Sequence, residues 1–182
     1  MNTLKPLIFV VPVIALILVS LLYVFLRQKT THKKSFTRFI VTTAILGFLL
    51  NLAWELLQMP LYNSTSFSIN HVTFCALGSV ADAIMVLLIY LGLALIFKQP
   101  LWVYPLLWQR ILIVILIGGV GAVLSEMRHL SVGNWAYSGL MPLIPVVQVG
   151  LSPVLQFMIL PSIIYILSFN CRKFLPFNRL ST

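Results

Sequence analysis

Acidic residues are almost absent from this chain. Of its 182 residues only three are Asp or Glu, against 12 Lys or Arg, and charged residues make up 8% of the total. Hydrophobic residues make up 60%, and the mean hydropathy is +1.06. A soluble domain of this length could not bury so much apolar surface, so the composition predicts an integral membrane protein. The net charge of +9 does not indicate a nucleic-acid partner, because the basic residues stand in short clusters between apolar runs, where they orient helices.

The motifs of several site classes are missing as well. The two cysteines form no CxxC pair, so neither a disulfide nor a thiolate metal site is predicted. No GxSxG, Walker or HExxH motif occurs, and no cofactor is indicated. Glu126 and His129 form one Glu-x-x-His pair on a helix face, whereas di-iron bundles need two such pairs. A single metal held by Glu126, His129 and either His71 or Asp82 stays open as an alternative to a metal-free site.

Five apolar runs are long enough to cross a bilayer as helices. They cover residues of about 7–26, 39–58, 75–97, 111–128 and 151–169. The predicted fold class is therefore all-α, a polytopic transmembrane helical bundle that forms a single domain over residues 1–182. Residues 130–150 are also apolar, but three glycines and two prolines interrupt them. Because an irregular backbone inside a membrane needs polar partners, we predict a re-entrant or interfacial loop that covers a site.

The basic residues predict how the bundle is oriented. Five lie between the first two spans, two between the third and fourth, and three after the fifth, whereas the opposite segments hold only Lys5 and Arg128. The positive-inside rule then places the amino terminus outside and the carboxyl terminus in the cytoplasm. The expected location is a cell membrane, namely a bacterial inner membrane. No inverted repeat is visible, which disfavours a secondary transporter.

All three acidic residues, Glu55, Asp82 and Glu126, fall inside the apolar runs or at their ends, where ionisable groups are costly and usually functional. A rise of about 1.5 Å per residue from the basic end puts Glu55 roughly 25 Å across the membrane. We therefore expect the three carboxyls to meet near the outer face and, with His129, to act as acid/base groups. The alternative for Glu55 and Glu126 is an interfacial carboxylate that is paired with Arg128 or capped by loop amides.

Other polar and aromatic residues are expected at the same depth. Asn51, Glu55 and Gln58 stand at i, i+4 and i+7, so they share one helix face. Arg128 and His129 would orient an anionic or polar head group. The aromatic residues are also typical of an ordinary interfacial belt. The residues expected to contact a substrate are Asn51, Gln58, His71, Arg128, Trp135, Tyr137 and Gln156.

Three short patterns carry a resemblance. They are WExxQxPLY at 54–62, GxWxYxxxMPxxP at 133–145 and GLSPxLQ at 150–156. Together, over residues 51–161, they resemble a family of small bacterial multi-span integral membrane proteins of unassigned role. They are remotely similar to the intramembrane carotenoid lycopene cyclases and hydratases, in which an acidic residue precedes aromatics and prolines. That similarity implies membrane carboxyls that protonate an isoprenoid double bond, although this chain lacks their acidic residue directly after the proline-containing turn.

Three functions remain as hypotheses. The first is a membrane-embedded enzyme that acts on a lipid or isoprenoid near the outer leaflet. The second is a non-enzymatic membrane subunit or assembly factor, which would bind a membrane-protein partner through lines of small residues on the third and fourth spans. The third is a small proton- or ion-coupled carrier. On the fourth span these lines are Gly118–Ala122–Glu126 and Gly121–Ser125–His129.

Overall fold

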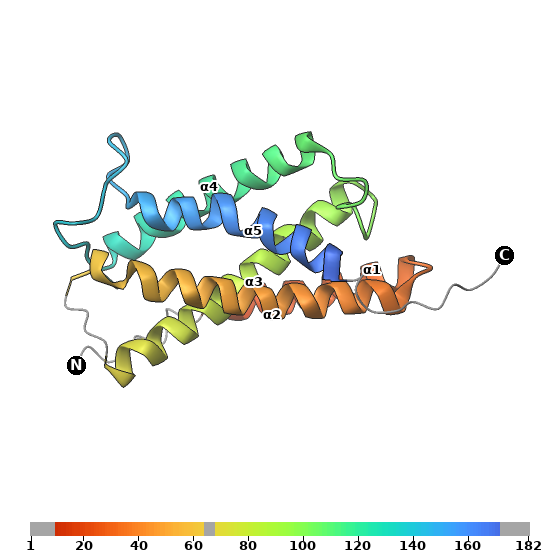
Figure 1. Ribbon diagram of the computed structural model, residues 1–182, viewed down its shortest axis with the longest axis horizontal. Coiled ribbons are helices and arrows are strands. Elements are labelled where there is room, and N and C mark those ends of the chain that lie inside the picture. The colour runs from red at the N-terminus through yellow and green to blue at the C-terminus, as the bar shows by residue number, and fades with distance from the viewer. Residues whose placement is uncertain (1–9, 64–67, 172–182) are drawn as a thin grey trace.

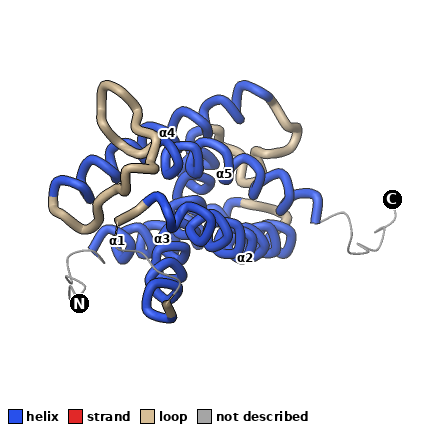
Figure 2. The backbone as a smooth tube through the Cα atoms, turned by 60° about the vertical axis from the view of Figure 1, so that its left-hand side comes forward, coloured by secondary structure: helices blue, strands red, loops and turns tan. Residues whose placement is uncertain are grey.

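The protein is a bundle of five long helices. A computed structural model describes residues 10–63 and 68–171. In chain order the helices are α1 Val10–Lys29, α2 Lys33–Gln58 with a short 3-10 turn η2 Met59–Leu61, α3 Ile69–Ile96, α4 Trp108–Ser131 and α5 Leu151–Cys171. All five are long and apolar enough to cross a membrane, and the described residues contain no strand (Figure 2). The predicted all-α fold of five membrane-spanning helices is confirmed.

The helices extend beyond the apolar runs that predict them. Helix α2 already begins at Lys33, within the basic cluster, and α3 begins at Ile69. Ser68 caps α3, because its side-chain oxygen accepts the main-chain N–H of His71 at 3.4 Å. Such a cap satisfies one of the free N–H groups of the first turn, so the helix starts in the polar segment ahead of the apolar run.

Neighbouring helices follow the order α4, α5, α2, α3, α1. The closely packed pairs are α4 with α5, α5 with α2, α2 with α3, and α3 with α1. Figure 1 shows α2 and α5 running side by side along the length of the molecule, while α3 crosses them diagonally. The amino-terminal end of α3, yellow in Figure 1, projects from the rest of the bundle. The pair α2 and α5 therefore stands at the centre of this order.

A proline and a glycine set the contact between α4 and α5. Pro161 lies inside α5 and has no N–H to give to the carbonyl of Phe157, four residues earlier. Gly118 of α4 packs directly on that carbonyl, where a Cβ would collide with the oxygen. Such close approach through a glycine is common where helices meet in membranes. At Gly47 the approach of α2 to α3 is less close, since an added Cβ would lie 3.4 Å from the Cβ of Ala83.

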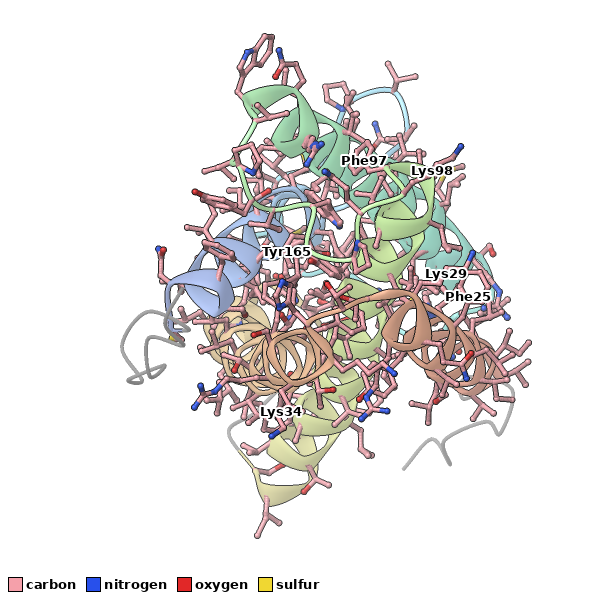
Figure 3. All side chains as sticks on the ribbon, turned by 90° about the vertical axis from the view of Figure 1, so that its right-hand side faces the viewer. Phe25, Lys29, Lys34, Phe97, Lys98 and Tyr165 are labelled. Carbon is pink, nitrogen blue, oxygen red and sulfur yellow. The ribbon has the colours of Figure 1, made fainter. Side chains whose placement is uncertain are left out.

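One end of the bundle carries the Lys and Arg side chains of the described residues except Arg128, and we call it the basic end. Figure 3 looks onto it and shows Lys29, Lys34 and Lys98 arranged around it. Its core is aromatic: Tyr90, Trp102 and Tyr165 are fully buried, and their rings stack or meet edge to face at 5.1 to 5.8 Å between centroids.

The opposite end carries the non-helical residues 132–150, which we call the lid segment, and this end is the lid end (Figure 1). Isolated bridges join Tyr62 to Tyr137 and Leu143 to Gly150. The main-chain N–H of Ser138 donates to the Leu61 carbonyl at 2.9 Å, so the lid segment is attached to the end of α2. An irregular loop is thus present, but it begins at residue 132 and not at 130, because α4 continues to Ser131. Its backbone finds the partners that such a loop requires.

Candidate functional site

Buried amides link α2 to α5 near the lid end. Gln58 Nε2 donates to Glu55 Oε1 at 3.0 Å and to Gln156 Oε1 at 3.2 Å. Gln58 Oε1 accepts from Ser152 Oγ at 2.8 Å. Gln58 is 4% exposed and Gln156 1% exposed. Both N–H bonds of Gln58 and its carbonyl oxygen are therefore used, which fixes this side chain in one orientation.

Gln156 extends the network to a third helix. Its Nε2 donates to Asn51 Oδ1 on α2 at 2.9 Å and to Asp82 Oδ2 on α3 at 3.2 Å. Asn51 in turn donates to the carbonyl of Gly47 at 2.7 Å. A single amide thus bridges α2, α3 and α5, and it fixes the position of one Asp82 oxygen. The other oxygen of Asp82 accepts no hydrogen bond from the described residues.

Glu126 is held by the lid segment. Trp135 Nε1 donates to Glu126 Oε2 at 3.2 Å, and the Tyr137 hydroxyl donates to the same oxygen. The side chain is 6% exposed on the face of α4 that packs against α5. Its Oε1 accepts no hydrogen bond within the described part of the chain. The lid segment therefore anchors one of the two Glu126 oxygens.

The three carboxyls converge. Glu55, Asp82 and Glu126 lie near enough to one another to interact electrostatically. Within the described residues their hydrogen-bond partners are neutral amides, an indole and a phenol. The alternative in which Glu126 pairs with Arg128 is not seen. Glu126 is buried and Arg128 is exposed, because residues two positions apart on a helix point in different directions. All three acidic residues of the chain thus share one site, and none of these hydrogen-bond partners carries a positive charge.

Aromatic rings surround Glu126. The Tyr62 ring lies 5.5 Å from Tyr137 and 6.4 Å from Trp135, between centroids. Burial, followed by the nearby Glu126, raises the pKa of Tyr62 well above its usual value. Burial, followed by the hydrogen bond to Glu126, does the same to the pKa of Tyr137. Both phenols therefore keep their protons at ordinary pH, and that of Tyr137 donates to Glu126.

The rings of His129 and His71 contact other side chains than the carboxyls. The His129 ring stacks on Trp135 at 4.2 Å, and its Nδ1 is 2.6 Å from the amide nitrogen of Asn134. It therefore supports Trp135 and has no hydrogen bond to a carboxyl. The His71 ring bonds to Ser68 at the start of α3, about 16 Å along the helix from Asp82. Among the described residues no group of three His, Cys, Asp or Glu is placed to hold a metal ion.

Two residues of the site, Ser152 and Tyr62, are not predicted from the sequence. Ser152 links Trp54 to Gln58: Trp54 Nε1 donates to Ser152 Oγ at 3.3 Å, and Ser152 donates onward. Tyr62 lies within electrostatic range of all three carboxyls. A usable signal existed for Ser152, which precedes Gln156 by four residues and so shares its helix face. Nothing in the sequence distinguishes Tyr62 from an ordinary interfacial tyrosine.

The two lines of small residues on α4 have different surroundings. Gly118, Ala122 and Glu126 are buried against α5, so this line is used inside the protein. Gly121 and Ser125 are exposed, and a Cβ added to Gly121 would meet nothing within 4 Å. Only this second line is free to meet a partner.

Comparisons of the chain with family models, with curated proteins and with solved structures found no match. The function therefore has to be argued from the chemistry of the site itself.

Proposed function

We propose that this protein is a membrane-embedded enzyme that moves protons to and from a lipid-soluble substrate, a lipid or an isoprenoid, by carboxyl acid/base chemistry. The observation that carries the proposal is the convergence of Glu55, Asp82 and Glu126 on one site with neutral partners. Unpaired charge is expensive to bury, so such a cluster is cheaper to keep partly protonated. A cluster that holds protons in an apolar setting is an acid catalyst for apolar molecules.

Glu126 is the proposed acid. Its Oε2 already receives hydrogen bonds from Trp135 and Tyr137, so the proton resides on Oε1. When that proton passes to a substrate oxygen or double bond, the two donors stabilise the carboxylate that remains. Glu55 or Asp82 then takes a proton from the substrate, and the N–H groups of Gln58 and Gln156 stabilise whichever carboxylate is ionised. One proton is given and one taken, so the protein returns to its starting state after proton exchange within the cluster.

The side chains around Glu126 favour contact with an apolar part of a substrate. Tyr62, Trp135 and Tyr137 present aromatic rings there, whereas exposed Arg128 lies elsewhere on α4. Aromatic faces also stabilise positive charge that develops on a protonated double bond. The remote similarity of the motifs to isoprenoid enzymes points to the same substrate class. An anionic head group, which Arg128 and His129 were expected to orient, has less support.

We place the site at the outer face of a cell membrane, a bacterial inner membrane, with the amino terminus outside. Support comes from the basic end, where Lys29, Lys34 and Lys98 gather at the far side of the bundle from the lid segment (Figures 1 and 3). By the positive-inside rule that end faces the cytoplasm.

Replacement of each carboxyl by its amide tests the proposal. Strains that carry Glu126→Gln, Glu55→Gln or Asp82→Asn would be compared with the wild type by mass spectrometry of total lipid extracts. We expect one lipid or isoprenoid species to accumulate and its product to disappear, with Lys34→Gln, at an exposed residue of the basic end, as the matched control that leaves the profile unchanged. Unchanged lipids and unchanged growth in all three amide variants would refute the proposal.

A non-enzymatic subunit or assembly factor is the second candidate, favoured by the exposed Gly121 and Ser125 on α4. It predicts a stable complex with another membrane protein after purification in mild detergent. Replacement of Gly121 by Leu would disrupt that complex, whereas Glu126→Gln would leave it intact. A carrier would instead show substrate-linked proton movement in reconstituted vesicles.

A further inference from the structure

The second half of the lid segment forms a loop that closes on itself, and we call residues 140–150 the lid loop. The main-chain N–H of Ile144 donates to the Val149 carbonyl at 2.8 Å, and the N–H of Leu151 donates to the Pro142 carbonyl at 2.8 Å. Part of the backbone therefore finds its partners within the loop itself. Such a segment lies beside lipid at a lower cost than one whose polar groups all stay open.

One side of the lid loop packs on the bundle. Ile144 and Val147 are partly buried against a small apolar cluster. The cluster contains Ala122 of α4, Val154 of α5 and the fully buried Val149. These contacts fix the loop to the beginning of α5 and to the neighbouring part of α4.

The other side of the lid loop is also apolar, but it is exposed. Leu140 is 72% exposed, Leu143 43% and Val146 96%. No Asp, Glu, Lys or Arg occurs in the chain between Arg128 and Arg172. A loop that faces water carries polar residues on its outward side, whereas a segment between protein and lipid is apolar on both sides. The composition of the lid loop is that of a segment in contact with lipid.

The lid loop points across the helices and not along them. It stands out to the side of the bundle at the lid end (Figures 1 and 2). Because the helices are the membrane spans, a loop that runs across them follows the membrane surface. Leu151, which begins α5 directly after the loop, is exposed as well. The exposed apolar surface therefore continues from the lid loop onto a span.

We propose that Leu140, Leu143 and Val146 insert among the acyl chains just beneath the lipid head groups and anchor the lid segment to the bilayer. The backbone of the loop then stays at the level of the head groups, where polar partners are present for the groups that its own hydrogen bonds leave open. This inference goes beyond the proposed enzyme, because the contact with lipid exists with or without a reaction.

The base of the lid loop is joined to the hydrogen bonds that hold Glu126. A Cβ added to Gly150 would lie 2.8 Å from Met141 Sδ and 3.0 Å from Tyr137 Cζ, so the chain passes close to that ring. The Tyr137 hydroxyl donates to Glu126. A displacement of the loop base would therefore displace the ring that holds the carboxyl. The bilayer thus helps to keep the lid segment in place over the site.

Spin labels measure the depth of the lid loop. Val146→Cys would be labelled in the full chain with Cys75→Ala and Cys171→Ala, and reconstituted in vesicles of phosphatidylethanolamine and phosphatidylglycerol. The label should collide more often with O₂, which concentrates in lipid, than with a water-soluble nickel chelate. Leu21→Cys, at an exposed residue in the middle of α1, gives the lipid reference, and His32→Cys, at an exposed residue of the basic end, gives the water reference.

The collisions distinguish lipid from the other possible surroundings. Access of the nickel chelate as high as at His32→Cys would place the loop in water and overturn the proposal. Exclusion of both reagents would mean that a second copy of the chain covers the loop, and this would overturn it as well. A photoreactive benzophenone side chain at position 146 should crosslink to lipid in intact cells. A crosslink to another protein in its place would also overturn the proposal.

A charge in the lid loop gives an independent measurement. Val146→Asp should lower the unfolding temperature in the same vesicles by several degrees, because an ionisable group is costly below the head groups. Asn63→Asp, at an exposed residue of the lid end outside the loop, is the matched control and should unfold like the wild type.

The same substitution at a water-facing residue would be nearly neutral. An unchanged unfolding temperature of Val146→Asp would therefore contradict the anchor. If this variant does not fold, Val146→Asn is measured in its place, with a decrease again expected. Neither measurement uses activity, so failure of the proposed enzyme would leave both results as they are.

Discussion

The two ends of the bundle bury polar atoms in different ways. At the basic end the aromatic side chains donate to main-chain carbonyls: Tyr165 to Val86 at 2.6 Å and Trp102 to Tyr90 at 3.1 Å. At the lid end buried side chains bond to one another, as Gln156 does to Asn51 and Asp82.

The difference separates a structural core from a site. Main-chain acceptors are present in any helix, so an aromatic core that uses them needs few special residues. Bonds between side chains make up only about 10–15% of hydrogen bonds in folded proteins, and a network of them loses stability when any member is missing. The lid end retains a costly arrangement that packing alone does not require, and this supports a functional role there.

The largest effect is expected on activity, from a substitution at the lid end. Glu126→Gln removes the proposed proton donor but keeps the shape of the side chain and its contacts with the lid segment. Product formation should fall by about 10²–10⁴-fold, the usual contribution of general acid–base catalysis. The unfolding temperature should stay near that of the wild type. Purified wild type and variant would be compared in vesicles that contain the lipid found to accumulate in the mutant strain.

The reverse pattern is expected at the basic end. Trp102 is fully buried among Tyr90, Tyr165 and Phe97. Trp102→Ala should lower the free energy of unfolding by about 3–5 kcal/mol, the cost of truncating a large aromatic side chain in a core. Activity per folded molecule should persist. An equal loss of activity per folded molecule in both variants would mean that the two ends do not divide their roles in this way.

A glycine between the two ends should give an intermediate effect. In Gly118→Ala the added methyl group collides with the Phe157 carbonyl, so α4 must move away from α5. We expect a loss of about 1–3 kcal/mol in unfolding free energy, as for other overpacked contacts. Gly121→Ala, whose Cβ meets nothing within 4 Å, is the control and should unfold like the wild type in the same thermal denaturation assay.

The smallest effect is expected in the pH dependence of the lid segment. The pKa of Tyr137 is raised above its usual value of 10.0 by burial and then by its bond to Glu126. A raised folded-state pKa means that the phenol stabilises the fold fully below pH 10, and that this stabilisation is lost as the pH rises beyond it. Tyr137→Phe should flatten the decline of the unfolding temperature above pH 10, while Tyr104→Phe, at an exposed residue, should not.

The sequence alone determined the spans and part of the site. Long apolar runs define the five helices because a membrane-crossing helix needs about 20 apolar residues. The glycines and prolines of residues 130–150 rule out a regular sixth helix there. The spacing of Asn51, Glu55 and Gln58 places them on one helix face, and all three are indeed in or beside one network.

Only the tertiary structure decided which helices meet and which polar residues join the site. Gln156 reaches Asn51 and Asp82 because α5 packs along α2, and α3 packs on that same helix. His129 is turned onto Trp135 and His71 onto Ser68. In a soluble protein the polar face of each helix would reveal its rotation. In a membrane, lipid-facing and helix-facing side chains are both apolar, so the rotation and the neighbours of each helix leave little trace in the sequence.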